Sequence, residues 1–128
     1  MLDTNIAIYV LKKRPENALK SFNRNSGKLC ISSITFAELM HGVENSARPE
    51  HNLQQVEDFI SRLQVLNYGT HAAAHYGNIR ASLERIGKPI GVNDLHIAGH
   101  ARSEELVLVT NNLAEFERVE GLELENWV

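Results

Sequence analysis

Two patterns of apolar residues alternate along the chain. In some segments the apolar residues return every three or four positions, which predicts amphipathic helices; these segments are 4–13, 16–25, 35–45, 50–63, 70–86, 93–102 and 113–118. Between them lie short apolar runs that predict strands, at 1–2, 29–31, 65–66, 106–109 and 122–127, the last as an edge strand. Run 106–109 is apolar throughout, which is typical of a sheet covered on both faces. Strands alternating with helices predict a parallel α/β sheet of four or five strands.

The length of 128 residues predicts a single domain spanning 1–128, large enough to bury a core without disulfides. Cys30 is the only cysteine and falls in a predicted strand, so we expect a buried, reduced thiol. No secretion signal and no run long enough to span a membrane is visible, and we expect a cytoplasmic protein without membrane contact.

The formal net charge of −3 argues against a generic nucleic-acid coat, which would be basic overall. It does not exclude a nuclease, because acids gathered at one site lower the net charge while local basic patches hold phosphates. Two groups of cations are candidates for such patches, namely 12–14 and the set Arg80, Arg85 and Lys88. The alternative is that these charges belong to ordinary solvated helix faces.

Three acids occupy comparable settings near predicted strand ends. Asp3 follows the first strand, Glu38 lies in the helix after the second, and Asp94 begins the helix before strand 106–109. The carboxyl ends of parallel strands share one edge of a sheet, so these acids can converge. Two carboxylates about 4 Å apart repel by roughly 4 kcal/mol at an effective dielectric constant of about 20, which calls for a cation or shifted pKa values. Oxygen ligands of this kind favour Mg²⁺ or Mn²⁺. The alternative is that each acid only caps the N-terminus of its helix.

Two histidine pairs, His71/His75 and His96/His100, stand at helical spacing and could each seat zinc. Neither pair carries the Glu of H-E-x-x-H or a third ligand at a telling spacing, so we interpret them as structural.

Five sequence pieces match a known family in order and spacing: MLDTN (1–5), SSITFAELMHG (32–42), RxGxPIGxxD (85–94), IAGHA (97–101) and VTNNxxEF (109–116). Through these pieces the chain resembles the PIN-domain ribonucleases and, within them, the VapC toxins of toxin–antitoxin pairs. The resemblance implies a three-layer α/β/α PIN-like fold with a central, mainly parallel sheet of four to five strands.

The resemblance also implies site residues. Asp3, Glu38 and Asp94 would be the catalytic acids that bind the divalent metal, Mg²⁺ with Mn²⁺ as a substitute. Family members often carry a fourth acid where this chain has Asn112, which orients water or phosphate without supplying charge and so favours one bound ion over two. Thr110 and Asn5 would be hydrogen bonders around the acids, and Arg85 or Lys88 would hold the RNA backbone. A few residues usually precede the M-L-D in this family and complete the first strand, whereas Met1 and Leu2 alone precede Asp3 here.

The function implied is that of a metal-dependent endoribonuclease toxin. Its expected substrate is tRNA, with the anticodon loop of initiator tRNA as a candidate. Expected partners are a cognate VapB-type antitoxin and a second copy of the chain in a homodimer, with operator DNA bound only through the antitoxin complex. The alternatives are a non-catalytic PIN-like binding module, whose metal site Asn112 weakens, and a nuclease directed at DNA.

Overall fold

The computed structural model describes all residues from Met1 to Val128. The elements follow in the order α1 (Thr4–Lys12), α2 (Glu16–Arg24), β1 (Cys30–Ser32), α3 (Ser33–Glu44), α4 (Pro49–Ile60), β2 (Gln64–Leu66), α5 (Thr70–Arg85), α6 (Val92–Ser103), β3 (Leu108–Val109), α7 (Leu113–Phe116) and β4 (Leu124–Glu125). Every predicted helix and strand is present except the first strand, which is reduced to one paired residue.

That residue, Leu2, joins two halves of a parallel sheet. It pairs with Ile31 of β1 on one side and with Val109 of β3 on the other. Because β1 pairs in parallel with β2 and β3 pairs in parallel with β4, the sheet order is β2–β1–Leu2–β3–β4. The predicted parallel sheet of four to five strands is therefore confirmed, with its centre shorter than expected.

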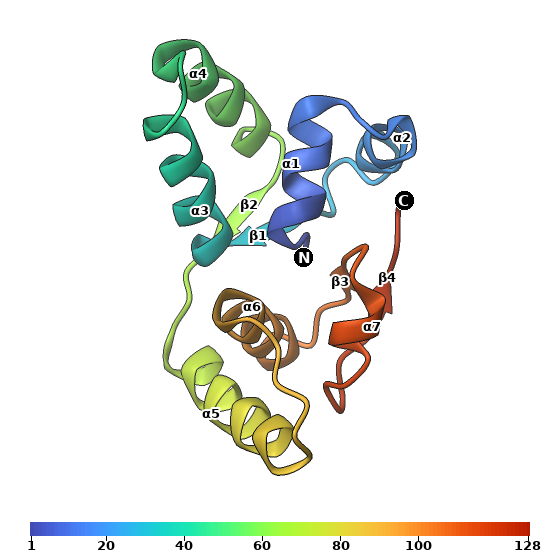
Figure 1. The fold of residues 1–128 in the computed structure, drawn as a ribbon. Coiled ribbons are helices and arrows are strands. Elements are labelled where there is room, and N and C mark those ends of the chain that lie inside the picture. Colours follow the sequence, from blue (N-terminus) through green and yellow to red (C-terminus); the bar gives the residue numbers. More distant parts are fainter.

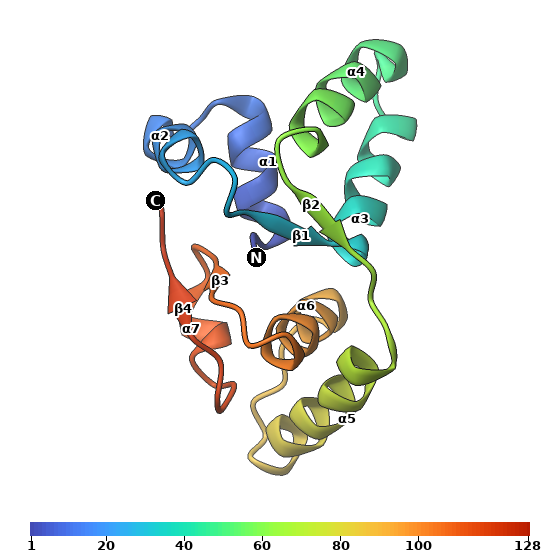
Figure 2. The ribbon, with the colours of Figure 1, turned by 180° about the vertical axis from the view of Figure 1, so that it is seen from behind.

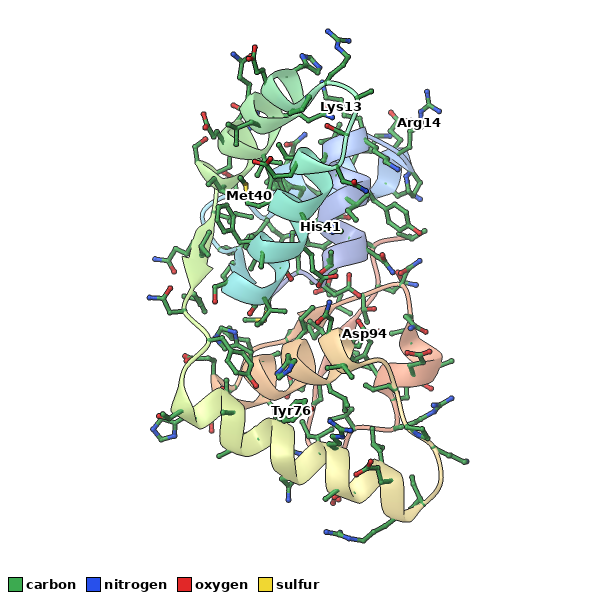
Figure 3. All side chains as sticks on the ribbon, turned by 60° about the vertical axis from the view of Figure 1, so that its left-hand side comes forward. Lys13, Arg14, Met40, His41, Tyr76 and Asp94 are labelled. Atoms are coloured by element: carbon green, nitrogen blue, oxygen red, sulfur yellow. The ribbon has the colours of Figure 1, made fainter.

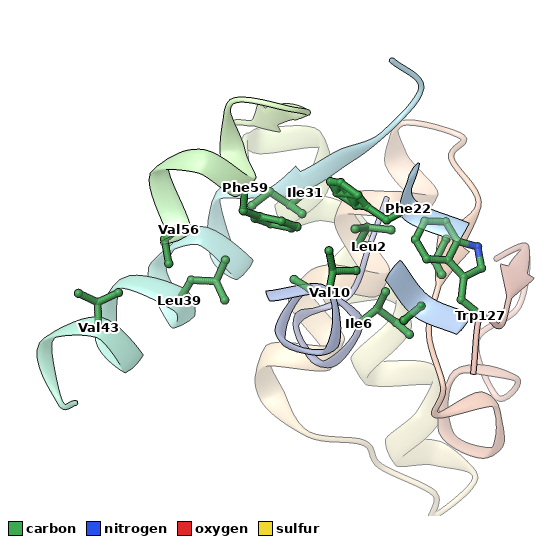
Figure 4. Close-up of a cluster of buried hydrophobic side chains, with 13 residues drawn as sticks. Leu2, Ile6, Val10, Phe22, Ile31, Leu39, Val43, Val56, Phe59 and Trp127 are labelled. Atoms are coloured by element: carbon green, nitrogen blue, oxygen red, sulfur yellow. The ribbon is translucent and has the colours of Figure 1, made fainter. Parts of the chain in front are cut away.

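Apolar residues on the central strands alternate between two cores, one on each face of the sheet. Leu2, Ile31 and Val109 belong to the core beneath α1 to α4, together with Phe22, Phe59 and Trp127 (Figure 4). Their chain neighbours Met1, Cys30 and Leu108 belong to the core beneath α5 and α6. Figures 1 and 2 show the two groups of helices on opposite sides of the sheet. Side chains of a strand point alternately to its two faces, so these apolar pairs produce the three-layer α/β/α fold.

Several elements are shorter than the apolar pattern predicts. The strand predicted over 106–109 contains only β3, because the Leu106 N–H donates to the carbonyl of Ala101 and closes the end of α6. The helix predicted over 113–118 is the single turn α7, and the edge strand predicted over 122–127 is β4 alone. Cys30 is free and buried, as predicted, and no helix is both long and apolar enough to cross a membrane.

Helices α5 and α6 cross closely at a glycine. A Cβ atom on Gly99 would lie 2.9 Å from the backbone nitrogen of Tyr76 and 3.0 Å from the carbonyl oxygen of Ala72. Neither backbone atom can move aside as a flexible side chain could, so any larger residue would push the helices apart. This contact fixes α6, and with it Asp94 in its first turn, against α5.

Candidate active site

Asp3 lies where the pairing of Leu2 ends and α1 begins. Its backbone N–H donates to the carbonyl of Val109, and its Oδ1 accepts the Ile6 N–H at 2.9 Å as the helix N-cap. The residue is only 2% exposed. Burial raises the pKa of this carboxyl, hydrogen bonds from Thr110 and Ile6 lower it, and the nearby Glu38 raises it. Asp3 is thus a helix cap and also a member of an acidic group.

Glu38 is held by a short chain of hydroxyl groups between α1 and α3. Its Oε1 accepts the Thr4 hydroxyl at 2.7 Å, and Thr4 Oγ1 lies 3.1 Å from the hydroxyl oxygen of Thr35. Because Thr4 has one hydroxyl proton and gives it to Glu38, Thr35 must donate to Thr4. Thr4 and Thr35, which sequence reasoning missed, therefore aim this carboxylate at the N-terminal end of α1.

Asp94 lies in the first turn of α6, whose N-cap is Gly91, so the helix-cap alternative is wrong for this residue. Burial, followed by the charges of Asp3, Glu115 and Glu38, raises the pKa of Asp94 to about 6. A carboxyl group at a helix N-terminus would ordinarily be stabilised as an anion by the helix dipole. Here burial, and after it the like charges of the neighbouring acids, raise the pKa instead.

Glu115 is a fourth acid that sequence reasoning missed. It lies in the first turn of α7, just beyond the end of β3, and its charge acts on Asp94 more strongly than that of Glu38 does. The available signal was the Glu of VTNNxxEF, a motif in which a short helix follows directly after a central strand. Glu115 thus brings a negative charge near Asp94 three residues after Asn112, and the expectation of one bound ion rather than two stays a prediction.

The residues around β3 have distinct roles. Thr110 is fully buried, bonds Asp3 through its hydroxyl group, and accepts the backbone N–H of Asn112 at 2.9 Å. The Asn112 side chain makes no hydrogen bond, so its orienting role stays a prediction. Asn111 donates to the Tyr9 hydroxyl at 3.0 Å, which ties the end of β3 to α1.

The remaining predicted residues lie farther from this group. Asn5 is exposed and its side chain makes no hydrogen bond, so the hydroxyl of its neighbour Thr4 fills the position predicted for it. Arg85 at the end of α5 and Lys88 in the loop toward α6 are both exposed and contact none of the acids. Their contact with RNA remains a prediction.

The four acids suit a divalent cation by charge and by donor type. All are carboxylates, three of them begin or enter the first turn of a helix, and their mutual repulsion is visible in the raised pKa of Asp94. Oxygen ligands of this kind are those that Mg²⁺ and Mn²⁺ prefer. No three His, Cys, Asp or Glu side chains stand close enough to hold an ion as they are, so binding requires side-chain movement. Figure 3 shows Asp94 between the two groups of helices, α1 to α4 and α5 to α6.

Comparison with known proteins agrees with the fold and the motif order. The family model of the PIN domain matches residues 1–122. The chain is 61% identical over 128 residues to the protein named ribonuclease VapC2 from Haemophilus influenzae, covering 100% of this chain and 97% of that protein. It is 56% identical over 127 residues to the protein named tRNA(fMet)-specific endonuclease VapC from Salmonella typhimurium, covering 99% and 96% of the two chains.

A solved structure shares the whole architecture. The crystal structure of DNA-bound VapBC from Salmonella typhimurium contains a chain that is 55% identical and superposes with a TM-score of 0.95, covering 100% of this chain and 97% of that one. The full-length match at this identity leaves no insertion large enough to change the fold. The chain therefore belongs to the PIN-domain family and, within it, to the VapC ribonucleases.

Proposed function

We propose that this protein is a metal-dependent endoribonuclease that hydrolyses phosphodiester bonds in RNA. The observation that carries the proposal is the setting of Asp94, where burial and then the charges of Asp3, Glu115 and Glu38 raise its pKa to about 6. Such a cluster costs stability without a cation, and perturbed carboxyls of this kind gather at functional sites. The names of the relatives, ribonuclease VapC2 and tRNA(fMet)-specific endonuclease VapC, support the same reaction class.

In the proposed mechanism Asp3, Glu38 and Asp94 hold the ion, and Glu115 completes the negative charge around it. A bound Mg²⁺ or Mn²⁺ would polarise the scissile phosphate and lower the pKa of an attacking water. Thr110 keeps the Asp3 carboxylate oriented, and the Thr35–Thr4 hydroxyl chain does the same for Glu38. Asn112, at the start of α7, would orient water or a phosphate oxygen.

We propose tRNA as the substrate class, with initiator tRNA the first candidate. The support is the 56% identity over nearly the full length to a protein named for cleavage of tRNA(fMet). Arg85 and Lys88 are exposed, form no salt bridge, and lie in the segment that leads into α6 and Asp94, where they would meet the RNA backbone.

The proposed protein partner is a VapB-type antitoxin. A groove of about 420 Å³ lies between α1, α3 and α4 and is lined by both apolar and polar residues. Its lining residues are Ile8, Leu11, Lys12, Glu38, Leu39, Gly42, Val43, Asn52, Gln55 and Val56. An antitoxin segment laid in this groove could place an arginine against the acids. Any contact with operator DNA would then come through that complex, and the homodimer that the resemblance implies stays a prediction.

The non-catalytic alternative rested on the missing charge at Asn112. Glu115 adds a negative charge near Asp94, and the names of the relatives, ribonuclease VapC2 and tRNA(fMet)-specific endonuclease VapC, support the enzyme over this alternative.

Cleavage of RNA by the purified chain should depend on the metal. Incubated with total RNA in EDTA it should be inactive, and Mg²⁺ or Mn²⁺ should restore cleavage, whereas Ca²⁺ should not because its looser coordination positions water poorly. Sequencing of the new RNA ends would identify the cleaved species, with initiator tRNA expected. Undiminished cleavage in EDTA would contradict the metal mechanism, and cleavage of DNA but not RNA would contradict the substrate class.

A further inference from the structure

His100 in α6 is a buried polar residue that the proposed mechanism does not use. Its side chain is only 1% exposed, and its Nδ1 lies 2.8 Å from the hydroxyl oxygen of Ser32. Ser32 is the last residue of β1 and is fully buried. Burial lowers the pKa of His100, and the charge of Glu104 raises it by less, so the ring is mainly neutral at pH 7.5. A neutral imidazole in the core thus joins α6 directly to the end of β1.

The direction of this hydrogen bond follows from the second bond that Ser32 makes. As the N-cap of α3, its Oγ accepts the backbone N–H of Ile34 at 3.1 Å. The single hydroxyl proton is then free to donate, and His100 Nδ1 is the acceptor within reach. Nδ1 is therefore unprotonated, and the ring proton sits on Nε2, a buried atom without a hydrogen-bond partner. The contact needs an acceptor at the position of Nδ1 and nothing at the position of Nε2.

Ser32 reaches both helical layers because it stands where a strand becomes a helix. Strand side chains alternate between faces, so Ser32 and Cys30 point to the same face of the sheet, the one covered by α5 and α6. The next residue, Ser33, already begins α3 on the other side of the sheet. Gly99 fixes α6 against α5, and the adjoining His100 fixes it against the start of α3.

The two helices that meet at this bond carry two of the acids of the proposed metal site. Asp94 lies six residues before His100, about 9 Å along the axis of one continuous helix. On α3, Thr35 stands one turn after Ser32 and begins the chain of hydroxyl groups that holds Glu38. No other side-chain hydrogen bond joins α6 to β1 or α3. A displacement of the start of α3 relative to α6 would therefore change the spacing of the two carboxylates.

We propose that His100 is a positioning residue for cleavage, which sets the spacing of Glu38 and Asp94 through its hydrogen bond with Ser32. This inference rests on the proposed ribonuclease function and adds a residue that contacts none of the acids. The acceptor must be neutral, because a buried charge costs free energy and a protonated Nδ1 cannot accept the hydroxyl proton. Small misplacements of catalytic groups reduce rates strongly, so loss of this bond should lower turnover more than it weakens substrate binding.

The test replaces the ring with amides of two lengths. In His100→Asn the amide oxygen can occupy the position of Nδ1 and accept the Ser32 hydroxyl, whereas His100→Gln extends toward Nε2 and leaves the position of Nδ1 unfilled. Glutamine is closer to histidine in volume, so a role in core packing alone would favour His100→Gln. Positioning favours the shorter side chain. His100→Asn should keep kcat within about threefold of the wild type, and His100→Gln should lower it about tenfold or more with KM for RNA unchanged.

Two further variants test the bond from its other end and the substitution itself. Ser32→Ala removes the hydroxyl and should lower kcat to a similar extent. His100→Gln added to Ser32→Ala should cause little further loss, because residues that act through one bond are not additive. Calorimetric titration should show Mn²⁺ binding weakened about tenfold in His100→Gln. The matched control is His71→Gln, at an exposed histidine of α5, which should cleave RNA and bind Mn²⁺ as the wild type does. Melting curves establish that each variant is folded.

A second measurement uses the wild-type chain. The nitrogen-15 chemical shifts of the His100 ring at pH 7.5 should show a neutral ring with its proton on Nε2 and a hydrogen bond accepted at Nδ1. A proton on Nδ1, a His100→Gln variant that cleaves as well as His100→Asn or better, or fully additive losses in the double variant would overturn the positioning role alone. A wild-type chain that neither binds Mn²⁺ nor cuts RNA would overturn the ribonuclease function as well.

Discussion

Asp94→Asn should sharply reduce cleavage and, in EDTA, make the protein more stable. Loss of one anionic group from the proposed metal site should weaken metal binding and reduce cleavage by about a hundredfold or more, comparable with the removal of one electrostatic group from a preorganised site. The same change relieves the repulsion that Asp3, Glu115 and Glu38 exert on Asp94. A gain in stability together with a loss of activity separates a charged site residue from one that merely supports the fold.

The gain should depend on pH in a defined direction. The folded-state pKa of Asp94 is raised from 3.8 to about 6, so its protonated form is favoured by folding. In the metal-free protein, the stability that protonated Asp94 contributes is fully present below pH 4. It is lost as the pH rises through about 6. Since Asp94 is partly exposed, solvent screening reduces the full linkage value to about 1 kcal/mol, or roughly 3–5 °C in melting temperature. The gain should be seen at pH 7.5 and be nearly absent at pH 4.

Asp58→Asn is the matched control, because Asp58 is the one aspartate besides Asp3 and Asp94 and forms only an exposed pair with Arg62. It should leave cleavage unchanged and lower stability by about 0.5 kcal/mol or less. Wild-type cleavage by Asp94→Asn would show that Asp94 has been misassigned.

Glu115→Gln should lower metal affinity and cleavage by about tenfold to a hundredfold, the range seen when groups that support metal ligands are removed. The substitution keeps the shape of the side chain and removes one of the charges that raise the pKa of Asp94. Glu117→Gln, at the other end of the same short helix, is the control: Glu117 is exposed and does not act on Asp94, so activity should stay at the wild-type level. Equal loss in both variants would mean that general surface charge, not position, matters.

The fold could be predicted from the sequence because the apolar pattern of the central strands directly reflects the two helical layers that cover the sheet. Each central apolar pair, such as Cys30 and Ile31, supplies one side chain to each core, and this needs a covered parallel sheet. The lengths of the elements were predicted less accurately than their order. Leu106 is apolar and reads as strand, yet its N–H closes the end of α6, a competition between two backbone partners that composition does not reveal.

The site was predicted in part for a related reason. Asp3, Glu38 and Asp94 lie near strand ends, and parallel topology brings such positions to one edge. Glu115 was missed because its place depends on where α7 begins after β3, not on the strand itself. Thr4 was passed over for Asn5 because neighbouring helix residues differ by about 100° in direction, and packing of Ile6, Ala7 and Val10 decides which one faces α3.

The central claim, that four carboxylates form one divalent-cation site, is tested most directly by calorimetric titration of the metal-free protein with Mn²⁺ at pH 7.5. The wild type should bind Mn²⁺, and each of the amide variants Asp3→Asn, Glu38→Gln, Asp94→Asn and Glu115→Gln should bind it at least about tenfold more weakly. Asp58→Asn and Glu117→Gln should bind it as the wild type does. A wild-type chain that shows no Mn²⁺ binding, or site variants that bind as tightly as the two controls, would contradict the account.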